Sequence, residues 1–464
     1  MKFMKFGKAL AMGALSAAVV LGVTSCVESY TVGFLYVTGT VTVSSGSNGI
    51  ISGYKIDHNT GRLTPINTLP VASGGANPVR AILTLGSRFL YVLNRGVTAS
   101  GSADCYGTGA NACLNSNIEQ FAVGGNGVLT PQETFFTQGI NPFRMFADAS
   151  GNFLYVLDHD APDDVSPSST DNCALALGKS VTTCGDITAF KIDQNTGRLS
   201  LVVNAQVTAT TSGQPITYFP VPSNPVDFVL GGGGIVLTLG STSSATSYPY
   251  TGGSFVFPYT YATATGQLTA SQNGTQPLLI QQGTAIVNAN GVIYVLDNEP
   301  ITIPSGVVSV FPAGNYLSQI LPYSLGAGGA LDAETSGPIP DGGGLSNPIF
   351  LLVESKGKYV YVANQGNNVV GPLQNSGLAG YFLTTAPAYQ LSFIAEEPFG
   401  SGSGPQCIVE DPSDQFIYEA DQYDSTVTGR LLDPNTGDLN DLRVVMDYKL
   451  QGPASWCLVD GRTS

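Results

Sequence analysis

One pattern of apolar and aromatic residues, typified by Phe-Leu-Tyr-Val, returns along the whole chain and each time runs into polar or small residues. A short apolar run of this kind predicts a strand that is buried on both faces. The seven copies are FLYVTGT at 34–40, FLYVLNR at 89–95, FLYVLDH at 153–159, IVLTLGS at 235–241, VIYVLDN at 292–298, YVYVANQ at 359–365 and FIYEADQ at 416–422.

A second element follows each copy and predicts a strand, a tight turn and a further strand. Asn-Thr-Gly occupies several of these turns, and its glycine supplies the positive φ that a tight hairpin needs. The seven segments are 51–66, 118–131, 187–202, 254–270, 308–320, 379–394 and 427–442.

A third element precedes the aromatic strand. A proline, usually after Asn or Gly, breaks the chain, and the following run predicts a short buried strand. Six segments have this pattern or stand at the equivalent place in the repeat: 77–86, 141–150, 224–233, 282–291, 347–356 and 404–413. The seventh is 452–461, so the chain begins with the second strand of a unit and ends with the first strand of one.

These repeats predict an all-β protein, a seven-bladed β-propeller of four-stranded antiparallel blades. One unit cannot cover its two apolar faces, whereas seven arranged radially can. Residues 454–460 should pair with residues 34–40 and close the ring, which disfavours the alternative of an open array. We expect three regions: residues 1–25 as a signal peptide, 26–33 as a lipidated N-terminus with a short linker, and 34–464 as the propeller.

The first residues have the features of a bacterial export signal. Lys2, Lys5 and Lys8 precede the apolar stretch Ala9 to Val23, and Val-Thr-Ser-Cys at 23–26 resembles a lipobox. That resemblance implies that Cys26 is acylated and becomes the first residue of the mature chain, so that the membrane is a partner. The alternative is an ordinary secretory signal beside an unrelated cysteine. The expected location is the bacterial cell envelope, either the outer membrane and periplasm or the cell surface, and Val27 in place of Asp favours the outer membrane.

The charge balance argues against nucleic acid as a partner. The net charge is −15, and without the three signal lysines the mature chain has 15 basic against 33 acidic residues. The glycine runs at 231–234 and 342–344 are not followed by the lysine of a phosphate-binding loop. We therefore expect no cofactor.

The cysteine count suggests disulfides in an exported protein. Of seven cysteines, six remain when Cys26 is assigned to the lipid. Cys105 with Cys113 and Cys173 with Cys184 are close in sequence and predict two local bridges. Cys407 and Cys457 lie on neighbouring inner strands, where either a bridge across the closure point or two buried thiols are compatible with the sequence. No metal site is expected, because there is no Cys-x-x-Cys pair and only two histidines.

The Asn-Pro strand, the Phe-Leu-Tyr-Val strand and the Asn-Thr-Gly hairpin together resemble the lactonase-family, YVTN-repeat propellers, which include 6-phosphogluconolactonase-like and muconate-cyclising enzymes. The resemblance extends over about residues 30–464. It implies lactone hydrolysis less firmly than it implies the fold. Catalytic members often carry a histidine after the Gly-Pro of an inner strand, and here the residues at that place are Val79, Phe143, Val226, Ile349, Gln406 and Ala454.

The loops predicted to be long share one face of the ring. They are 96–117, 160–186 and 366–378, which join second to third strands, and the connections near 203–223 and 324–346. Repeat folds usually place binding on such a face. The predicted disulfides would either stiffen these loops for binding or only protect them from proteolysis.

Two equivalent positions are expected to line the mouth of the channel on that face. One, two residues after the proline, holds Arg80, Arg144, Asp227, Thr284, Phe350 and Cys407. The other, at the end of the aromatic strand, holds Gly39, Asn94, Asp158, Gly240, Asp297, Asn364 and Asp421. The alternative is that these Asn and Asp residues end strands by bonding to backbone, and that the arginines pair with neighbouring acids.

From these positions we select candidate roles. Arg80 and Arg144 are candidate oxyanion stabilisers, Asp158 and Asp297 candidate activators of water, and His159 a candidate base beside Asp158 and Asp160. Candidate ligand-binding residues are Asn94, Asp227, Asn364 and Asp421. Asp163, Asp164 and Asp171 follow His159, as in a solvated acidic loop or a hard-cation site, although the spacing fits no defined calcium loop. We interpret Trp456 as core between blades and His58 as structural.

Two functions follow. The first is a non-catalytic propeller that binds a protein, glycan or small molecule through the face with the long loops. The second is a lactone hydrolase in which a carboxylate at the channel mouth activates water. Whether the chain is an enzyme is left open by its sequence.

Overall fold

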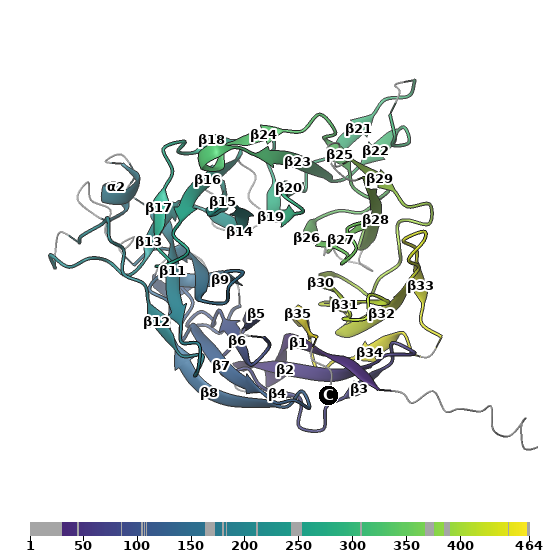
Figure 1. Cartoon of the computed structure of the whole chain (residues 1–464), viewed down its shortest axis with the longest axis horizontal. Coiled ribbons are helices and arrows are strands. Elements are labelled where there is room, and N and C mark those ends of the chain that lie inside the picture. Colours follow the sequence, from purple (N-terminus) through teal and green to yellow (C-terminus); the bar gives the residue numbers. More distant parts are fainter. Residues whose placement is uncertain are drawn as a thin grey trace, which may run out of the picture.

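The computed structural model describes residues 30–461 except 44–45, 85, 104, 106, 108, 163–171, 179–180, 182, 210–211, 243–252, 307–308, 367–374, 385–389 and 444. Over these residues, seven antiparallel blades surround a central axis (Figure 1). The predicted fold is therefore confirmed.

Each blade contains four strands that lie side by side, from an inner strand at the axis to a fourth strand at the outside. We number the blades 1 to 7, beginning with the one that closes the ring. The inner strands of blades 1 to 7 are β35 (Ala454–Asp460), β5 (Pro78–Thr84), β9 (Ile140–Ala147), β14 (Pro225–Gly232), β19 (Gly283–Ala289), β26 (Pro348–Val353) and β30 (Pro405–Glu410). The second strands are β1 (Thr31–Val43), β6 (Phe89–Asn94), β10 (Phe153–Asp160), β15 (Ile235–Ser241), β20 (Val292–Asp297), β27 (Tyr359–Asn364) and β31 (Phe416–Asp421).

The outer half of each blade is a hairpin. The third strands are β2 (Gly46–Asp57), β7 (Asn117–Val123), β11 (Cys184–Ile192), β16 (Ser254–Tyr261), β23 (Gln319–Leu325), β28 (Gly377–Leu383) and β32 (Thr426–Leu432). The fourth strands are β3 (Leu63–Pro65), β8 (Leu129–Phe135), β12 (Leu199–Leu201), β17 (Leu268–Ala270), β24 (Leu331–Ala333), β29 (Leu391–Phe393) and β33 (Leu439–Asp441). In five blades a further short strand also pairs with the third strand: β4 (Val71–Ala72), β13 (Phe219–Pro222), β18 (Gln276–Pro277), β25 (Ile339–Pro340) and β34 (Asp447–Lys449).

The ring closes as the split repeat predicts. β35 pairs antiparallel with β1, from Phe34 opposite Asp460 to Gly39 opposite Ala454. Cys407 of β30 and Cys457 of β35 form a disulfide between blades 7 and 1. Both ends of the propeller are thus held at one seam, by backbone pairing within blade 1 and by a covalent bond to its neighbour.

Blade 5 differs from the prediction. The segment 308–320 was expected to supply its outer hairpin, but that hairpin is β23 and β24, which lie further along the chain. Within 298–318 a separate two-stranded sheet forms from β21 (Ile301–Ile303) and β22 (Gly314–Tyr316). The apolar alternation around 308–311 resembles a third strand, but Phe311 and Tyr316 instead pack against Phe393 of blade 6.

The two main sequence motifs meet between neighbouring blades. In five second strands the tyrosine hydroxyl donates to the carbonyl of the turn glycine in the next blade: Tyr36 to Gly127, Tyr91 to Gly197, Tyr155 to Gly266, Tyr361 to Gly437 and Tyr418 to Gly61. These glycines have positive φ, and an added Cβ would collide with the aromatic residue two places before that tyrosine. The repeated tyrosine and the repeated turn glycine therefore form the same contact between neighbouring blades, in addition to their places in the strand and the turn.

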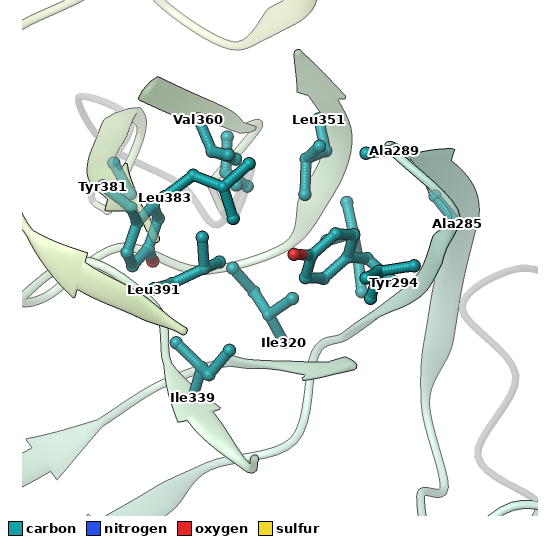
Figure 2. Close-up of a cluster of buried hydrophobic side chains, with 14 of the residues drawn as sticks. Ala285, Ala289, Tyr294, Ile320, Ile339, Leu351, Val360, Tyr381, Leu383 and Leu391 are labelled. Atoms are coloured by element: carbon teal, nitrogen blue, oxygen red, sulfur yellow. The ribbon is translucent and has the colours of Figure 1, made fainter. Parts of the chain in front are cut away.

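The hydrophobic core is divided among the gaps between blades. In one such gap, Tyr294 and Ile320 of blade 5 face Leu351, Val360 and the outer hairpin of blade 6 (Figure 2). These side chains are almost fully buried, so each blade depends on its neighbours to remove its apolar faces from water.

The connections define two faces. The turn face carries the turns between first and second strands and between third and fourth strands. The loop face carries the longer connections between second and third strands, as predicted, including the helix α2 (Asn172–Leu177) and the hairpin β21–β22. The segment 324–346, predicted as one long connection on this face, instead contains the end of β23, the turn to β24, β24 itself and β25, because the outer hairpin of blade 5 lies further along the chain than expected. Both predicted local bridges are present: Cys105–Cys113 lies within the connection from β6 to β7, and Cys173–Cys184 joins α2 to the first residue of β11.

Candidate functional site

A β-bulge at the loop-face end of every inner strand leaves one residue in an equivalent position in all seven blades. In each blade, one residue of the inner strand is skipped in the pairing. The residue before it pairs at or near the end of the second strand, and the residue after it pairs with the preceding position of that strand. Bulges commonly redirect side chains beside binding sites. The seven equivalent residues are Trp456, Arg80, Arg144, Asp227, Ala285, Phe350 and Cys407, in blade order.

Six of these seven residues line a cavity of about 150 Å³, which we call the central cavity. The inner strands that supply them surround the axis in Figure 1. Its remaining wall is apolar and consists of Met145, Phe228, Ile286, Val287 and Ile349. Cys407, at the seventh position, is bonded to Cys457.

The structure corrects two expectations about this ring. In blade 5 the position belongs to Ala285, because the bulge falls between Gly283 and Ala285. Thr284 is buried instead, with its hydroxyl on the backbone carbonyls of Leu296 and Pro348. Trp456, interpreted as core between blades, does pack against the cores on both sides of blade 1, but it is only partly buried and also lines the central cavity. Its register with Thr38 in the predicted closing pair would have revealed this position.

Arg80 and Trp456 form one side of the cavity. The guanidinium carbon of Arg80 lies 3.8 Å from the centroid of the Trp456 ring, a cation–π contact. The indole N–H donates to the carbonyl of Ala81 at 3.0 Å, and the ring meets Phe350 edge-on with centroids 5.2 Å apart. Burial, and then the charge of Arg144, hold the pKa of Arg80 well below its usual value, while Asp227 acts in the opposite direction.

Arg144 and Asp227 form the other side. The Nε of Arg144 lies 3.2 Å from Oδ1 of Asp227, and the two side chains are 22% and 13% exposed. The other carboxylate oxygen, Oδ2, accepts the backbone N–H of Ile286 at 3.1 Å. Asp227 thus connects blades 3, 4 and 5 and fixes the guanidinium of Arg144.

The candidates at the ends of the second strands lie elsewhere. Asn94, Asp158, Asp297, Asn364 and Asp421 are fully buried inside the blades and are absent from the wall of the central cavity. In blades 2, 3 and 7 the connection that enters the blade passes over this strand end. An added Cβ at Gly75, Gly139 or Gly402 of these connections would meet the side chain of Asn94, Asp158 or Asp421 at under 3.0 Å. These residues therefore do not line the channel mouth as expected.

Asp158 faces a second buried carboxyl group. It pairs across the sheet with Asp186, and the hydroxyl of Thr188 lies 3.2 Å from Asp158 Oδ2 and 3.3 Å from Asp186 Oδ2. Both groups are removed from solvent. Burial raises the pKa of each, and the charge of Asp158 raises that of Asp186 further.

The other two candidate aspartates, which are also buried, are held by hydrogen-bond donors as well. Burial raises the pKa of Asp297 to about 6, although Gln319 and the N–H of Gln282 donate to its carboxylate. Burial, then the charge of Asp424, raises the pKa of Asp421 to about 7, against hydrogen bonds from Thr426 and Thr428.

The histidines lie outside the central cavity. His159 Nδ1 is 3.0 Å from Oδ2 of Asp160, which also accepts a hydrogen bond from Asn141. Asp163, Asp164 and Asp171 lie outside the described residues. His58 stacks on Tyr30 at the turn face, with ring centroids 4.5 Å apart.

The described part of the chain lacks two further features. Among those residues, no three His, Cys, Asp or Glu side chains converge as metal ligands. No helix among them has the length and apolar character needed to cross a bilayer. Cys26, the predicted lipidation site, lies outside the described residues.

Comparison with known proteins shows which family and which folds the chain resembles. Residues 43–172 match the family described as Lactonase, 7-bladed beta-propeller. No curated protein matches the chain in sequence. The fold is similar to that of the periplasmic gluconolactonase PpgL of Pseudomonas aeruginosa, with a TM-score of 0.60, 16% identity, and coverage of 92% of this chain and 99% of that one.

Two further solved structures are similar. A protein of Bacteroides uniformis named as a candidate 6-phosphogluconolactonase gives a TM-score of 0.59 at 14% identity, over 92% of this chain and 99% of that one. A protein of Lactobacillus plantarum gives 0.56 at 14% identity, over 93% and 99%. The resemblance to the lactonase-family seven-bladed propellers is therefore confirmed, by the family match over residues 43–172 and by the fold around it.

Proposed function

We propose that the central cavity binds a small anionic ligand with a flat or apolar body. The observation that carries the proposal is the pair of arginines in one cavity of about 150 Å³. Asp227 is the only carboxylate among the described residues that line it, so the wall has an excess of positive charge in a chain of net charge −15. An anion would offset the repulsion between the two guanidinium groups.

The two arginines are held by different contacts. In each arginine, N–H groups remain for a ligand. Arg144 is oriented by Asp227 through Nε, and Arg80 lies on the face of Trp456. Guanidinium groups fixed in this manner suit the planar, two-oxygen geometry of carboxylates and phosphates. Phe350 and Trp456 supply an apolar surface for the rest of the molecule. The volume favours a small molecule over a protein or glycan chain as the occupant.

Tryptophan fluorescence provides a direct test, because Trp456 is the sole tryptophan of the chain. We would titrate the protein with sugar acids, sugar phosphates and aryl carboxylates and follow its emission. Saturable binding should weaken at least tenfold in Arg80→Ala and remain unchanged in Arg88→Ala, whose arginine is exposed beside the turn face. Equal binding by both variants would contradict the proposal.

Lactone hydrolysis is the second candidate, and the family match favours it. Water would attack the lactone carbonyl, Asp227 would take the proton of the water, and Arg80 would stabilise the oxyanion before the ring C–O bond breaks and its oxygen is protonated. Against this role, both carboxylate oxygens of Asp227 already accept hydrogen bonds, from Arg144 and from the backbone N–H of Ile286, so the group is engaged in holding the wall of the cavity. The geometry therefore favours binding.

Turnover on a panel of sugar and aryl lactones separates the two functions. The binding proposal expects no hydrolysis above the uncatalysed rate. Hydrolysis that is lost in Asp227→Asn and Arg80→Ala but kept in Arg88→Ala would replace it with the hydrolase.

We also propose that the protein is exported and anchored in the cell envelope through acylated Cys26. The basic residues, apolar stretch and Val-Thr-Ser-Cys motif at its N-terminus support this, and three disulfides suit an oxidising compartment. Labelling with radioactive palmitate should mark the wild type and not a Cys26→Ser variant. Label retained in Cys26→Ser would contradict the anchor.

A further inference from the structure

We infer that the turn face of the propeller lies against the membrane and that the central cavity opens on the opposite side. This inference rests on the proposed anchor at Cys26. It follows from where the described chain begins and from the number of residues between that point and the lipid.

The starting point is fixed on the turn face. Tyr30 is followed at once by β1, whose first residue, Thr31, pairs with Asp57 at the start of the turn between β2 and β3. The backbone N–H of His58, in that turn, donates to the carbonyl of Tyr30 at 3.0 Å, and the two rings stack. The chain therefore leaves blade 1 beside its outer turn.

The tether is too short to reach the loop face. Four residue steps separate Cys26 from Tyr30 and span at most about 14 Å when fully extended. Nine steps of β1 separate Tyr30 from Gly39, which lies at the loop-face end of this blade, and at about 3.3 Å per residue they cover about 30 Å. A bilayer that holds the acyl chains must therefore lie next to the turn face.

The exposed side chain at the exit suits this position. Tyr30 is 50% exposed, and tyrosine favours the boundary between apolar and aqueous phases, where one end of its ring is wet. The bulges that form the central cavity lie at the other ends of the inner strands. A ligand from the aqueous compartment would then enter without passing between protein and membrane.

Photocrosslinking to lipid tests the orientation in the full, lipidated chain. Asn59 is an exposed amide residue in the outer turn of blade 1 on the turn face, and Gln451 is an exposed amide residue in the connection that enters blade 1 on the loop face. Each would be replaced, one at a time, by a benzophenone amino acid. The proteins would be purified from bacterial membranes and reconstituted in vesicles of phosphatidylethanolamine and phosphatidylglycerol. We expect at least fivefold more lipid adduct at position 59 than at 451, and equal or reversed yields would overturn the inference.

Two controls separate the orientation from the anchor. Flotation of the vesicles reports the anchor alone, and Cys26→Ser should abolish it; failure of the wild type to float would refute the anchor itself. Insertion of twenty Gly and Ser residues after Ser29 should preserve flotation and reduce the adduct at position 59 to the level at 451. An adduct unchanged by the insertion would show that tether length does not set the orientation.

Discussion

Arg80 and Trp456 are far apart in sequence and occupy equivalent bulges on the inner strands of adjacent blades, with the guanidinium 3.8 Å from the centroid of the indole ring. The contact exists only when the last strand of the chain closes the first blade. Formation of the central cavity is thus coupled to closure of the ring.

The first prediction concerns this contact. Replacement of Trp456 by Leu removes the aromatic face that holds Arg80, and cation–π contacts of this kind contribute about 0.5–2 kcal/mol. Affinity for an anionic ligand should fall about tenfold in Trp456→Leu and much less in Trp456→Phe, which keeps a ring. Calorimetric titration measures both, and equal losses would show that ring stacking does not position Arg80.

The second prediction concerns the seam. Cys407–Cys457 joins residues 50 apart, whereas Cys105–Cys113 joins residues 8 apart. In the chain-entropy account, these loops correspond to stabilisation of about 4 and about 2.5 kcal/mol. We compare a seam variant, with serine at positions 407 and 457, with a loop variant, with serine at positions 105 and 113. The seam variant should lose more unfolding free energy than the loop variant.

Urea unfolding followed by Trp456 fluorescence measures this difference. The seam variant should also bind ligand less well, because β35 carries Trp456 next to Cys457. A seam variant as stable as the loop variant would mean that the pairing of β1 with β35 alone holds the ring.

The repeats were sufficient to predict the blades and the closure, because both rest on a pattern that returns seven times, and cysteine spacing predicted the two local disulfides. For Cys407 and Cys457 the sequence left a bridge and two buried thiols open, and the structure shows the bridge. The repeats were insufficient where local sequence imitates a repeat. The alternation near Phe311 belongs to an inserted hairpin, since its side chain packs on Phe393 of the next blade. Only tertiary contacts distinguish such a hairpin from a third strand.

The candidate site could be predicted in part. Arg80, Arg144 and Asp227 were found from their offset after proline, which is a local feature that the bulge preserves. Asp158 and Asp297 were misplaced for a different reason. Whether the last residue of a strand meets the channel depends on the path of the connection that covers it, and that path is set by residues distant in sequence.

The third prediction concerns pH and the buried pair Asp158 and Asp186. Folding raises both pKa values above those of the unfolded chain, which are about 4. The folded state therefore binds protons more tightly. The resulting stability is complete below about pH 4 and is lost as the pH rises through the folded pKa values.

Asp186→Asn removes one of the two charges and can donate to Asp158. We expect a gain of roughly 1 kcal/mol in unfolding free energy at pH 8 and a flatter dependence on pH. Asp193→Asn is the matched control, because hydrogen bonds from Thr196 lower the pKa of the exposed Asp193 and the sign of its effect is opposite. Urea unfolding at pH 4, 6 and 8 measures both variants. A steeper dependence in Asp186→Asn would contradict the assignment.

The fourth prediction concerns Gly139, which covers the same pair. An added Cβ would lie 2.0 Å from Oδ1 of Asp186 and 2.5 Å from the Cβ of Asp158, distances at which the connection or the strands must move. Gly139→Ala should therefore cost about 2–3 kcal/mol of stability, as overpacked cores do. Gly125→Ala is the control, because an added Cβ there meets nothing within 4 Å and its φ is not positive. Since both variants lie outside the central cavity, thermal melting should separate them while ligand affinity, measured well below the melting range, stays the same. A neutral Gly139→Ala would show that the connection yields and does not seal the strand end.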